Sequence, residues 1–592
     1  MENVEIGWNR ILLHHKIDEK LKVFNGLETF ILLVSVFFTN IIYAQRVDVP
    51  RDADTSRLRP PTLPLPKTPK FDLRIESPEK SPVPKAVDDI EFDVNDIQIE
   101  GADYYPDTEV NKLFVGLIGN KISLSDLRVS VENLENKYKN DGFFLVRVFI
   151  PPQEVADGIF KIKVIEGYID AAYAEGGTSA AQKKINSIMA NVVGKKPINL
   201  ATLERVLLLL NDLPGISGSG VLRQGDKLGA SELIVTLNNL PPKAYSLTVN
   251  NGASKTMGLI STNFNATLNN PFSSVASSLG IGLSASVKNN NLRAWNTSYS
   301  QSIGDRGAIF SFAGLVADAE PKGSLKALGI VSRSYSLAPR IRFPLKRGRQ
   351  KSYYVELGVT NGKSKTTLQS SSITVDKSTV ADLAFSLTND VWFGGSTQIS
   401  FSVFHGLDLF GSFDKSTNVP SVSNFKQKFT KLKLIGNHSL PFNRYNLTLK
   451  ANVQAQWTDD KLLAGEQVSF GGPSIGRGYD GGAIAGDKGF GLSFELTKNI
   501  INNPFAFLKQ TNLELYAFVD YAEAYTLADV VSNVISSNSY LGSHGFGFRL
   551  NSADGLSLDF MAAEARNTFV SADARGNPRY VLSLTKAFWY FR

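Results

Sequence analysis

The second half of the chain alternates apolar and polar residues. From Lys243 to Arg592 we count about 16 segments of roughly 8 to 13 residues that alternate in this way, separated by clusters of Gly, Asn, Ser and Asp. In the clearest segment, Tyr445 to Trp457, every second residue is apolar or aromatic, and Lys450 lies with four amides at the positions between them. A strand that crosses a membrane needs about 9–11 residues. The lengths therefore favour strands with one face toward lipid and the other toward water.

The strands of a soluble β-sandwich also alternate apolar and polar residues. Two features of this sequence favour a membrane barrel instead. A lysine among amides suits a water-filled interior, and aromatic residues at both ends of the Tyr445 to Trp457 segment suit the two membrane interfaces. Inside a bilayer every backbone N–H and C=O must be paired within the protein, so the sheet has to close. Residues 243–592 are therefore predicted to form a 16-stranded antiparallel transmembrane β-barrel.

The residues before the barrel show the periodicity of helices and strands, and they form two consecutive units with the same order of elements. Over residues 90–167 the pattern predicts a strand at 92–99, helices at 107–117 and 123–138, and strands at 143–150 and 158–166. Ser123 is the expected N-cap of the second helix. Over residues 168–240 it predicts a strand at 168–174, helices at 180–190 and 200–211, and strands at 221–223 and 233–238. Two tandem copies of a β-α-α-β-β unit are a stronger signal than either copy alone.

The first 89 residues divide into an apolar part and a proline-rich part. An apolar run at 30–38 follows Lys16, Lys20 and Lys22 and leads to Ala44, a usable cleavage site. The run is short for a transmembrane helix, which is the alternative, so residues 1–44 are predicted to be a secretory signal peptide. Residues 45–89 contain about nine prolines, and this composition predicts an extended, semi-rigid linker with no core.

Composition narrows the classes of function. The chain has no cysteine, which excludes disulfides, thiol catalysis and cysteine–zinc sites. Its five histidines lack the spacing of a metal site, and we expect no cofactor and no metal. The net charge of +7 is modest for 592 residues and the basic residues are dispersed, so nucleic acid is not an expected partner. No nucleotide-binding motif is present either.

Four pieces of the tandem units together resemble one known family. They are residues 137–142 (KYKNDG), 150–153 (IPPQ), 158–167 (GIFKIKVIEG) and 203–215 (LERVLLLLNDLPG). In this order they resemble the paired POTRA domains of the outer-membrane translocators of two-partner secretion, the haemolysin or haemagglutinin activation/secretion proteins. The resemblance implies α+β tandem POTRA domains at 90–167 and 168–240, in the periplasm of a Gram-negative bacterium, followed by the barrel in the outer membrane. The aromatic end of the chain, Phe588 to Arg592, resembles the final strand of such barrels, which normally stops on the aromatic residue itself.

A glycine-rich stretch interrupts the strands of the barrel. Residues 470–495 carry about nine glycines, so this stretch is expected to form an ordered functional loop rather than a regular strand. Arg477-Gly478-Tyr479 within it resembles the [VI]RG[YF] tip that the superfamily carries on a loop folded back into the barrel, although Gly476 replaces the preceding valine or isoleucine. We therefore expect an inward-folded loop at 467–490.

The alternation also predicts which acidic residues face this loop. In the next two strands it places Glu495 and Asp520 in the lumen, and residues 518–520 (FVD) resemble the family's acidic partner of the loop arginine. A guanidinium inside a barrel needs a carboxylate, and bidentate geometry fixes its orientation. The group Arg477, Gly478, Tyr479, Glu495 and Asp520 is thus either a stabilised plug or a latch that rearranges during transport, and the two are not exclusive.

The resemblance implies an outer-membrane pore that recognises a large unfolded exoprotein and moves it to the cell surface. The expected partners are a large secreted β-helical exoprotein, haemagglutinin- or haemolysin-like, and the lipid of the outer membrane. An edge strand can bind an extended peptide by β-augmentation. The candidate surfaces are the strand that carries Phe143, Val146, Val148 and Ile150, and the strand at 221–223; the alternative is that both are ordinary sheet members.

Three other functions compete with this hypothesis. A barrel-assembly insertase of the same superfamily shares the loop and the barrel but usually has more than two POTRA units, and two periplasmic units argue against a passive porin. An enzyme is the third. Residues 472–476 (GPSIG) match G-x-S-x-G, but a nucleophile elbow requires a strand-to-helix turn, and Pro473 with no following helix makes the match a coincidence.

Overall fold

The computed structural model describes residues 51–66, 73–75, 91–155, 157–177, 179–239, 241–254, 256–272, 276–287, 291–321, 323–412, 419–502, 511–528, 536–566 and 577–590. The predicted signal peptide, much of the proline-rich linker and the last two residues lie outside the described residues. None of the helices in the described part of the chain has the length and apolar composition needed to span a bilayer.

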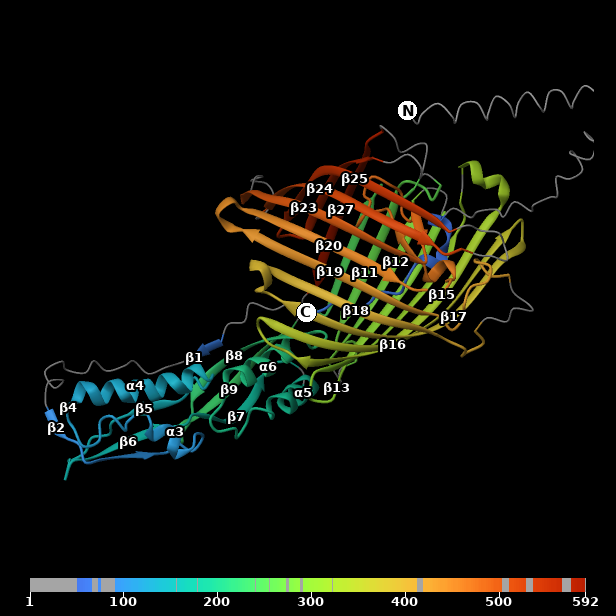
Figure 1. The fold of residues 1–592 in the computed structure, drawn as a ribbon. Helices are drawn as coiled ribbons and strands as arrows, with labels where there is room; N and C mark the ends of the chain where they lie inside the picture. The colour runs from blue at the N-terminus through green and yellow to red at the C-terminus, as the bar shows by residue number, and fades with distance from the viewer. Residues whose placement is uncertain are drawn as a thin grey trace, which may run out of the picture. The chain divides into compact units, whose positions relative to one another are not determined.

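Sixteen of the described strands form one closed barrel, and each is antiparallel to its neighbours (Figure 1). The prediction of a 16-stranded antiparallel barrel is confirmed. The strands are β10 (Lys243–Asn250), β11 (Ser261–Asn269), β12 (Ser277–Ser286), β13 (Leu292–Ile303), β14 (Ala308–Ala319), β15 (Ile330–Lys346), β16 (Lys351–Leu368), β17 (Ser371–Asn389), β18 (Ser396–Leu407), β19 (Thr430–Phe442), β20 (Leu447–Trp457), β23 (Lys488–Asn502), β24 (Thr511–Thr526), β25 (Ser537–Ser552), β26 (Leu556–Ala565) and β27 (Arg579–Tyr590).

The barrel closes between its first and last strands. β10 pairs with β27 over its whole length, from Lys243 opposite Tyr590 to Asn250 opposite Ser583. With this pairing and the β10–β11 pairing, β10 has a neighbour on each side, as backbone groups in lipid require. β20 begins two residues later than predicted, because Asn443–Tyr445 forms a 3₁₀ turn and Asn446 adopts a left-handed conformation with φ of 52°.

The two faces of the barrel wall differ as the alternation predicts. On β23 the side chains of Phe494 and Leu496 are exposed on the outside, whereas Glu495 between them is 6% exposed. On β24 Val519 is exposed and its neighbour Asp520 is 2% exposed. Because successive side chains of a strand point to opposite faces, apolar residues cover the outer wall and charged residues line the lumen.

The first α/β unit follows β2 (Glu91–Asp93). It contains β3 (Asp96–Glu100), α3 (Asp107–Asn111), β4 (Lys121–Ser123), α4 (Leu124–Asn140), β5 (Arg147–Phe149) and β6 (Ile159–Ile165). The sheet order is β3-β6-β5, and β2 pairs with β4. Ser123 caps α4 as expected: its hydroxyl accepts from the Asp126 amide at 3.1 Å, and the Asp126 carboxylate accepts from the Ser123 amide at 3.0 Å.

Two elements of this unit are shorter than predicted. α3 ends at Asn111, and the residues up to Ile118 form turns closed mainly by bonds three residues apart, such as Leu117 N–H to the Phe114 carbonyl at 2.9 Å. The strand predicted over 143–150 contains only Arg147–Phe149. The preceding turn lets Phe143 and Val146 both enter the core, which a continuous strand with a period of two would not allow.

The second α/β unit contains β7 (Tyr168–Glu175), α5 (Ser179–Met189), α6 (Leu200–Asn211), β8 (Ile216–Gln224) and β9 (Ala230–Asn239). Leucines of α6 pack with Ile169, Ile185 and Leu233 in one apolar core. The sheet order is β1-β8-β9-β7, and β1 (Leu73–Ile75) comes from the proline-rich linker. The predicted strand at 221–223 is therefore the middle of a longer strand with neighbours on both sides.

A buried ion pair joins the second unit to the barrel. Asp212, just after α6, accepts from Nε and Nη2 of Arg347 at 2.7 and 3.0 Å. Arg347 lies in the turn between β15 and β16, and its side chain is 0% exposed. Because this bidentate pair is enclosed, it fixes the end of α6 against that turn.

Candidate functional site

A long loop between β20 and β23 folds into the barrel. Two short strands of this loop, β21 (Val468–Phe470) and β22 (Ile484–Gly486), pair with each other inside the barrel. Its apolar side chains pack against the inner wall in a cluster of Val468, Phe470, Ile475, Tyr479, Ile484, Ala522, Ala524, Leu541 and Ala565. The glycine-rich stretch is thus an ordered part of the interior.

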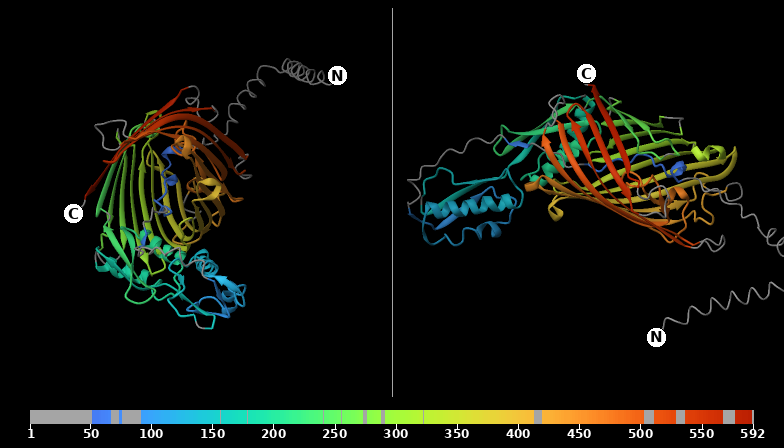
Figure 2. Two further views of the ribbon diagram at one scale, coloured as in Figure 1. Left: turned by 90° about the vertical axis from the view of Figure 1, so that its left-hand side faces the viewer. Right: turned by 90° about the horizontal axis from the view of Figure 1, so that it is seen from above.

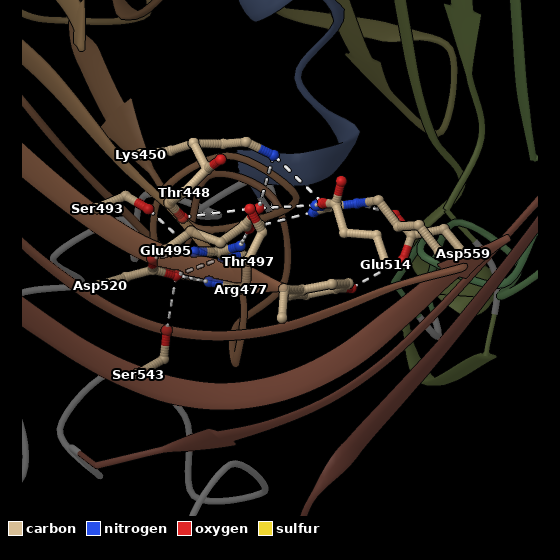
Figure 3. A network of polar contacts seen from close by, with 12 residues as sticks. Thr448, Lys450, Arg477, Ser493, Glu495, Thr497, Glu514, Asp520, Ser543 and Asp559 are labelled. Atoms are coloured by element: carbon tan, nitrogen blue, oxygen red, sulfur yellow. Dashed lines mark hydrogen bonds and ion pairs between the residues drawn. The ribbon is translucent and has the colours of Figure 1, made fainter. Parts of the chain in front are cut away.

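Arg477 at the loop tip binds two carboxylates of the barrel wall (Figure 3). Its Nε and Nη2 donate to Asp520 at 3.1 and 2.9 Å, and Nη1 donates to Glu495 at 2.6 Å. Nη2 also donates to the hydroxyl of Ser493 at 2.9 Å. The guanidinium carbon lies 3.5 Å from the centroid of the Phe518 ring. All these partners project from β23 and β24, so the loop tip is fixed to two neighbouring strands.

Asp520 also binds the loop backbone. Its Oδ2 accepts from the amides of Gly476 and Arg477 at 3.1 and 2.9 Å, and from the Ser543 hydroxyl at 3.2 Å. This carboxylate therefore recognises both the backbone turn and the side chain of the tip. Breaking a buried pair of this kind costs about 3–5 kcal/mol, and less in a hydrated lumen.

Glu495 connects the loop tip to a wider charged network (Figure 3). Its Oε1 accepts from Arg549 on β25 at 2.7 Å, and Lys450 on β20 lies 3.6 Å from the same oxygen. Glu514 accepts from Arg549 at 2.8 Å and from Lys450 at 3.3 Å. Arg549 and Lys450 thus both contact the carboxylates of Glu495 and Glu514. The alternation places Glu514 and Lys450 in the lumen, but the sequence analysis did not identify Arg549.

The other two residues of the tip fill a tight space against β25 and β26. A Cβ added to Gly478 would lie 2.9 Å from the Ala565 amide nitrogen, which leaves no room for a side chain. The hydroxyl of Tyr479 donates to the Gly542 carbonyl at 3.1 Å, and the residue is 3% exposed. Gly476 has φ of +90°, a conformation that suits glycine. This explains why glycine occupies the place of the valine or isoleucine in the resembled motif.

A second segment in the barrel comes from the proline-rich linker. Residues 51–66 include the short 3₁₀ turns Arg51–Ala53 and Thr55–Arg57 and lie within the ring of strands (Figure 2, left). Thr55 is 2% exposed, and its hydroxyl is 3.0 Å from that of Ser332 on β15. Arg342 on the same strand donates to the Pro64 carbonyl at 2.8 Å. The composition predicts a linker without a core, whereas these residues are bound to the inner wall.

The linker segment and the inward loop contact each other. Arg59 pairs with Glu466 at the base of the loop at 3.2 Å, and Lys431 of β19 pairs with the same carboxylate at 2.8 Å. Arg51 donates to the Ala483 carbonyl at 2.9 Å on the far side of the loop. Both segments therefore share the lumen and one buried carboxylate, a contact that the sequence analysis missed because proline content says nothing about where a segment docks.

The structure places the four predicted peptide-binding side chains in or against the core of the first unit. Phe143, Val146 and Val148 are at most 7% exposed, and Ile150 packs against the same cluster. The side chains are thus not available to a bound peptide. The Val148 amide, which lies on the edge of the sheet, donates to Glu135 of α4 at 3.1 Å. Glu135 thus occupies the main-chain edge of β5 at this residue.

Among the described residues no group of three or more acidic or histidine side chains could hold a metal ion. Around the loop tip, charged side chains pair with one another.

Comparisons with known proteins agree on one family. The family model described as haemolysin secretion/activation protein ShlB/FhaC/HecB matches residues 229–532, and that of the ShlB-type POTRA domain matches residues 92–167. The heme/hemopexin transporter protein HuxB of Haemophilus influenzae (strain 86-028NP) is 22% identical over 493 residues, which cover 81% of this chain and 84% of HuxB. The outer membrane transporter CdiB of Escherichia coli is 24% identical over 441 residues, 70% of each chain.

Solved structures show the same fold. CdiB from Escherichia coli superposes with a TM-score of 0.68 and 20% identity, covering 87% of this chain and 93% of CdiB. CdiB from Acinetobacter baumannii gives a TM-score of 0.61 at 17% identity and covers 86% of this chain and 91% of its own. At these identities the likeness establishes the arrangement of POTRA-like region and barrel.

Proposed function

This chain belongs to the haemolysin secretion/activation family ShlB/FhaC/HecB, and from that premise we propose that it passes one large unfolded exoprotein through its lumen and that the Arg477 contacts act as the latch of the pore. The family is one of transporters rather than enzymes, and the chain is an outer-membrane transporter of two-partner secretion with periplasmic POTRA domains.

The proposed partner is a haemagglutinin- or haemolysin-like exoprotein with a β-helical fold after export. Relatives named as a heme/hemopexin transporter and as the hemolysin transporter HpmB of Proteus mirabilis support this class of partner. The tandem α/β units offer sheet edges to an extended polypeptide, where main-chain bonds give affinity and side-chain pockets give choice. An unfolded partner suits this mode because its backbone groups are free to pair.

One observation carries the latch proposal. The lumen holds two segments of the chain itself, the inward loop and residues 51–66, and ion pairs hold both of them. A polypeptide can pass only when these segments rearrange. Arg477 is the residue whose release frees the loop tip, since Asp520, Glu495 and Ser493 all bind its guanidinium. We propose that the loop alternates between this bound arrangement and one that leaves a path.

The test compares secretion by three variants of the full-length protein, each co-expressed with a candidate haemagglutinin- or haemolysin-like exoprotein. Arg477→Ala should reduce secretion at least tenfold while the barrel stays in the outer membrane, because an ion pair of this kind is worth several kcal/mol. Arg477→Lys should be nearly as defective, since an ammonium cannot form the bidentate contact.

Arg333→Ala is the matched control. Arg333 forms an Arg–Asp pair with Asp318 at 3.0 Å on the barrel wall, but both side chains are largely exposed. We expect the Arg333→Ala variant to secrete the exoprotein normally, because exposed ion pairs contribute only about 0–1 kcal/mol. Normal secretion by Arg477→Ala at normal barrel levels would remove the latch from the mechanism.

A further inference from the structure

Three lysines lie together on the lipid side of the barrel wall. Thr366 of β16 faces the lumen, where its hydroxyl donates to Ser332 at 3.3 Å beside the linker segment. Because successive side chains of a strand point to opposite faces, Lys365 and Lys363 on the same strand project from the outer face. The register places Lys377 of β17 directly opposite Lys363. Lys363, Lys365 and Lys377 form what we call the outer lysine cluster.

The cluster lies at the extracellular end of the wall. The turn between β15 and β16 contacts the periplasmic second unit through Arg347, so the turn between β16 and β17 lies at the opposite end. Nearer the periplasm the outer face of these two strands is apolar, with side chains 44–49% exposed at Leu357, Leu383 and Phe385. Tyr335 of β15, opposite the cluster, is 47% exposed and suits a membrane interface. The lysines therefore lie at the headgroup level of the outer leaflet.

The charge of the cluster distinguishes it from other cations at this end of the barrel. Three of those cations are paired with carboxylates at 2.7 to 3.0 Å, namely Arg333 with Asp318, Lys426 with Asp460 and Lys488 with Asp459. Among the described residues no carboxylate forms an ion pair with the three lysines of the cluster. Lys363 and Lys377 instead face each other, and like charges at directly opposite positions destabilise a sheet. The described part of the wall thus leaves this repulsion without compensation.

We propose that the outer lysine cluster binds the phosphate groups of lipid A, the phosphorylated glycolipid of the outer leaflet. Lys363 and Lys377 hold one phosphate between their ammonium groups, because directly opposite side chains have Cβ atoms only about 4.5–5.5 Å apart. Lys365 lies two residues further from the bilayer, about 7 Å along the strand, and contacts a second phosphate. The acyl chains lie against the apolar outer face of the same strands. This inference goes beyond the transport function and depends only on the location in the outer membrane.

Two features favour lipid A over other anions. The lysines and the apolar surface share β16 and β17, so a ligand with both phosphate and acyl chains contacts both, whereas free phosphate contacts the lysines alone. A phospholipid such as phosphatidylglycerol carries one phosphate and lipid A carries two, which matches the second contact at Lys365. The site is also confined to one arc of the wall. On the outer face of β24, Tyr521 and Tyr525 donate to Glu523, so that arc presents an acidic group.

The first experiment measures lipid binding by the full-length protein in detergent, with purified lipid A as the probe and the mass of the intact complex as the readout. Lys363→Ala with Lys377→Ala should weaken binding about tenfold or more, since both charge-assisted contacts to one phosphate are lost. Lys426→Ala with Lys488→Ala is the matched control, because it removes two cations that already have carboxylate partners at the same end of the barrel. The control should bind lipid A as the unaltered protein does.

Two further probes test the chemistry of the ligand. Dephosphorylated lipid A keeps the acyl chains and the sugars, and phosphatidylglycerol keeps one phosphate. The unaltered protein should bind each of them about tenfold more weakly than lipid A, because each lacks at least one of the phosphate contacts.

The second experiment separates a binding role from a purely structural one. Without lipid, the variant Lys363→Ala with Lys377→Ala should be at least as stable to heat as the unaltered protein, because a like-charge pair has been removed. With saturating lipid A the unaltered protein should unfold at the higher temperature, since a ligand that binds only the folded state stabilises it. A structural role of the lysines would instead make the variant less stable in both conditions.

The outcomes decide the proposal without any exoprotein, so they stand apart from the transport proposal. Reversal of the stability order by lipid A, together with weak binding by the cluster variant, supports the site. Equal binding of lipid A by the cluster variant and the unaltered protein would overturn it, as would equal binding of dephosphorylated lipid A. Equal binding of phosphatidylglycerol would exclude a headgroup with two phosphates, and an equal loss in the control variant would show that overall charge attracts the lipid.

Discussion

At the scale of single residues, the site depends on one guanidinium and on the glycine beside it. Arg477 satisfies its donors within two strands of the wall, and this is possible only because the backbone of the tip approaches β26 closely. Gly478 permits that approach: its missing side chain leaves just enough space for the Glu564–Ala565 backbone. The arginine supplies the charge and the glycine allows it to reach its partners.

Gly478→Ala should therefore displace the loop tip without touching any charge. The added Cβ would meet backbone atoms at 2.9 Å, and backbone cannot move aside as a flexible side chain can. We expect the tip to become accessible to limited proteolysis and secretion to fall to a level near that of Arg477→Ala. Gly481→Ala is the control, since a Cβ there meets nothing within 4 Å. Equal protease resistance of both variants would show that the tip tolerates the methyl group.

Sequence reasoning reached part of this site. Alternation with a period of two brings Glu495 and Asp520 into the lumen, and the resembled motif points to Arg477. Arg549 was missed because its distance from Glu495 depends on the stagger between β23, β24 and β25, which no single strand encodes. The side chains predicted to bind a peptide in the first unit lie in or against its core for a local reason, which is the turn at Phe143 to Val146.

At the scale of elements, side chains of helices protect the edges of the small sheets. In the first unit Glu135 of α4 caps β5 by accepting from the Val148 amide and pairing with Lys139 and Arg147. Burial disfavours the charged carboxylate, but these three partners outweigh it, so the pKa of Glu135 lies below its usual value. A free strand edge invites pairing with other chains, and the cap prevents this.

The cap should fail in acid. A carboxylate whose pKa is lowered in the folded state stabilises the fold above its unfolded pKa of about 4.3 and loses that effect as the pH falls through the folded pKa. We expect the Val148 amide to exchange hydrogen faster, after correction for intrinsic rates, once the pH drops below about 4. In Glu135→Gln the Val148 amide should exchange fast at every pH. Glu132 is exposed on the same helix, so in Glu132→Gln this amide should exchange as it does in the unaltered protein. If the corrected exchange rate of the Val148 amide in the unaltered protein did not change with pH, Glu135 would not be acting as a cap.

The elements themselves were predictable to different degrees. Long alternating strands and the leucine-rich α6 follow from periodicity, because each buries one face against a large core. β1 was not predictable, because three residues among prolines carry no pattern and acquire a strand conformation only from β8. α3 stopped early since turns can bury Val110 and Phe114 as well as a helix can.

At the scale of the whole molecule, the barrel encloses two of its own segments, which meet at Glu466. Arg59 from the linker and Lys431 from the wall neutralise this carboxylate at the base of the inward loop. The occupancy of the lumen by one segment is therefore coupled to the position of the other. No local pattern predicts this coupling, because its partners lie about 400 residues apart in the sequence.

Reversing one charge should open the pore. Arg59→Glu places a carboxylate beside Glu466 and should raise the frequency of channel opening in planar bilayers by roughly three- to tenfold. A pair whose arginine is half-exposed contributes about 1 kcal/mol, and repulsion between the two carboxylates adds to its loss. Arg59→Lys keeps the charge and should remain close to the unaltered protein. High salt should reduce the difference in opening frequency between Arg59→Glu and the unaltered protein, because the Debye length falls to about 3 Å at 1 M. Identical opening by both variants would exclude the ion pair from gating.

The join between β10 and β27 imposes an order on biogenesis. Lys243 pairs with Tyr590, which lies about 350 residues later in the chain. The barrel therefore cannot close until its last strand has been synthesised and delivered across the inner membrane. The two α/β units precede that stretch; the core of the first contains none of its residues, and the core of the second includes one, Ala276, which comes early in it. They can mature while the wall is still an open, aggregation-prone ribbon. A chain truncated before β27 should thus accumulate as a folded head with an uninserted tail, a ready substrate for periplasmic chaperones and proteases.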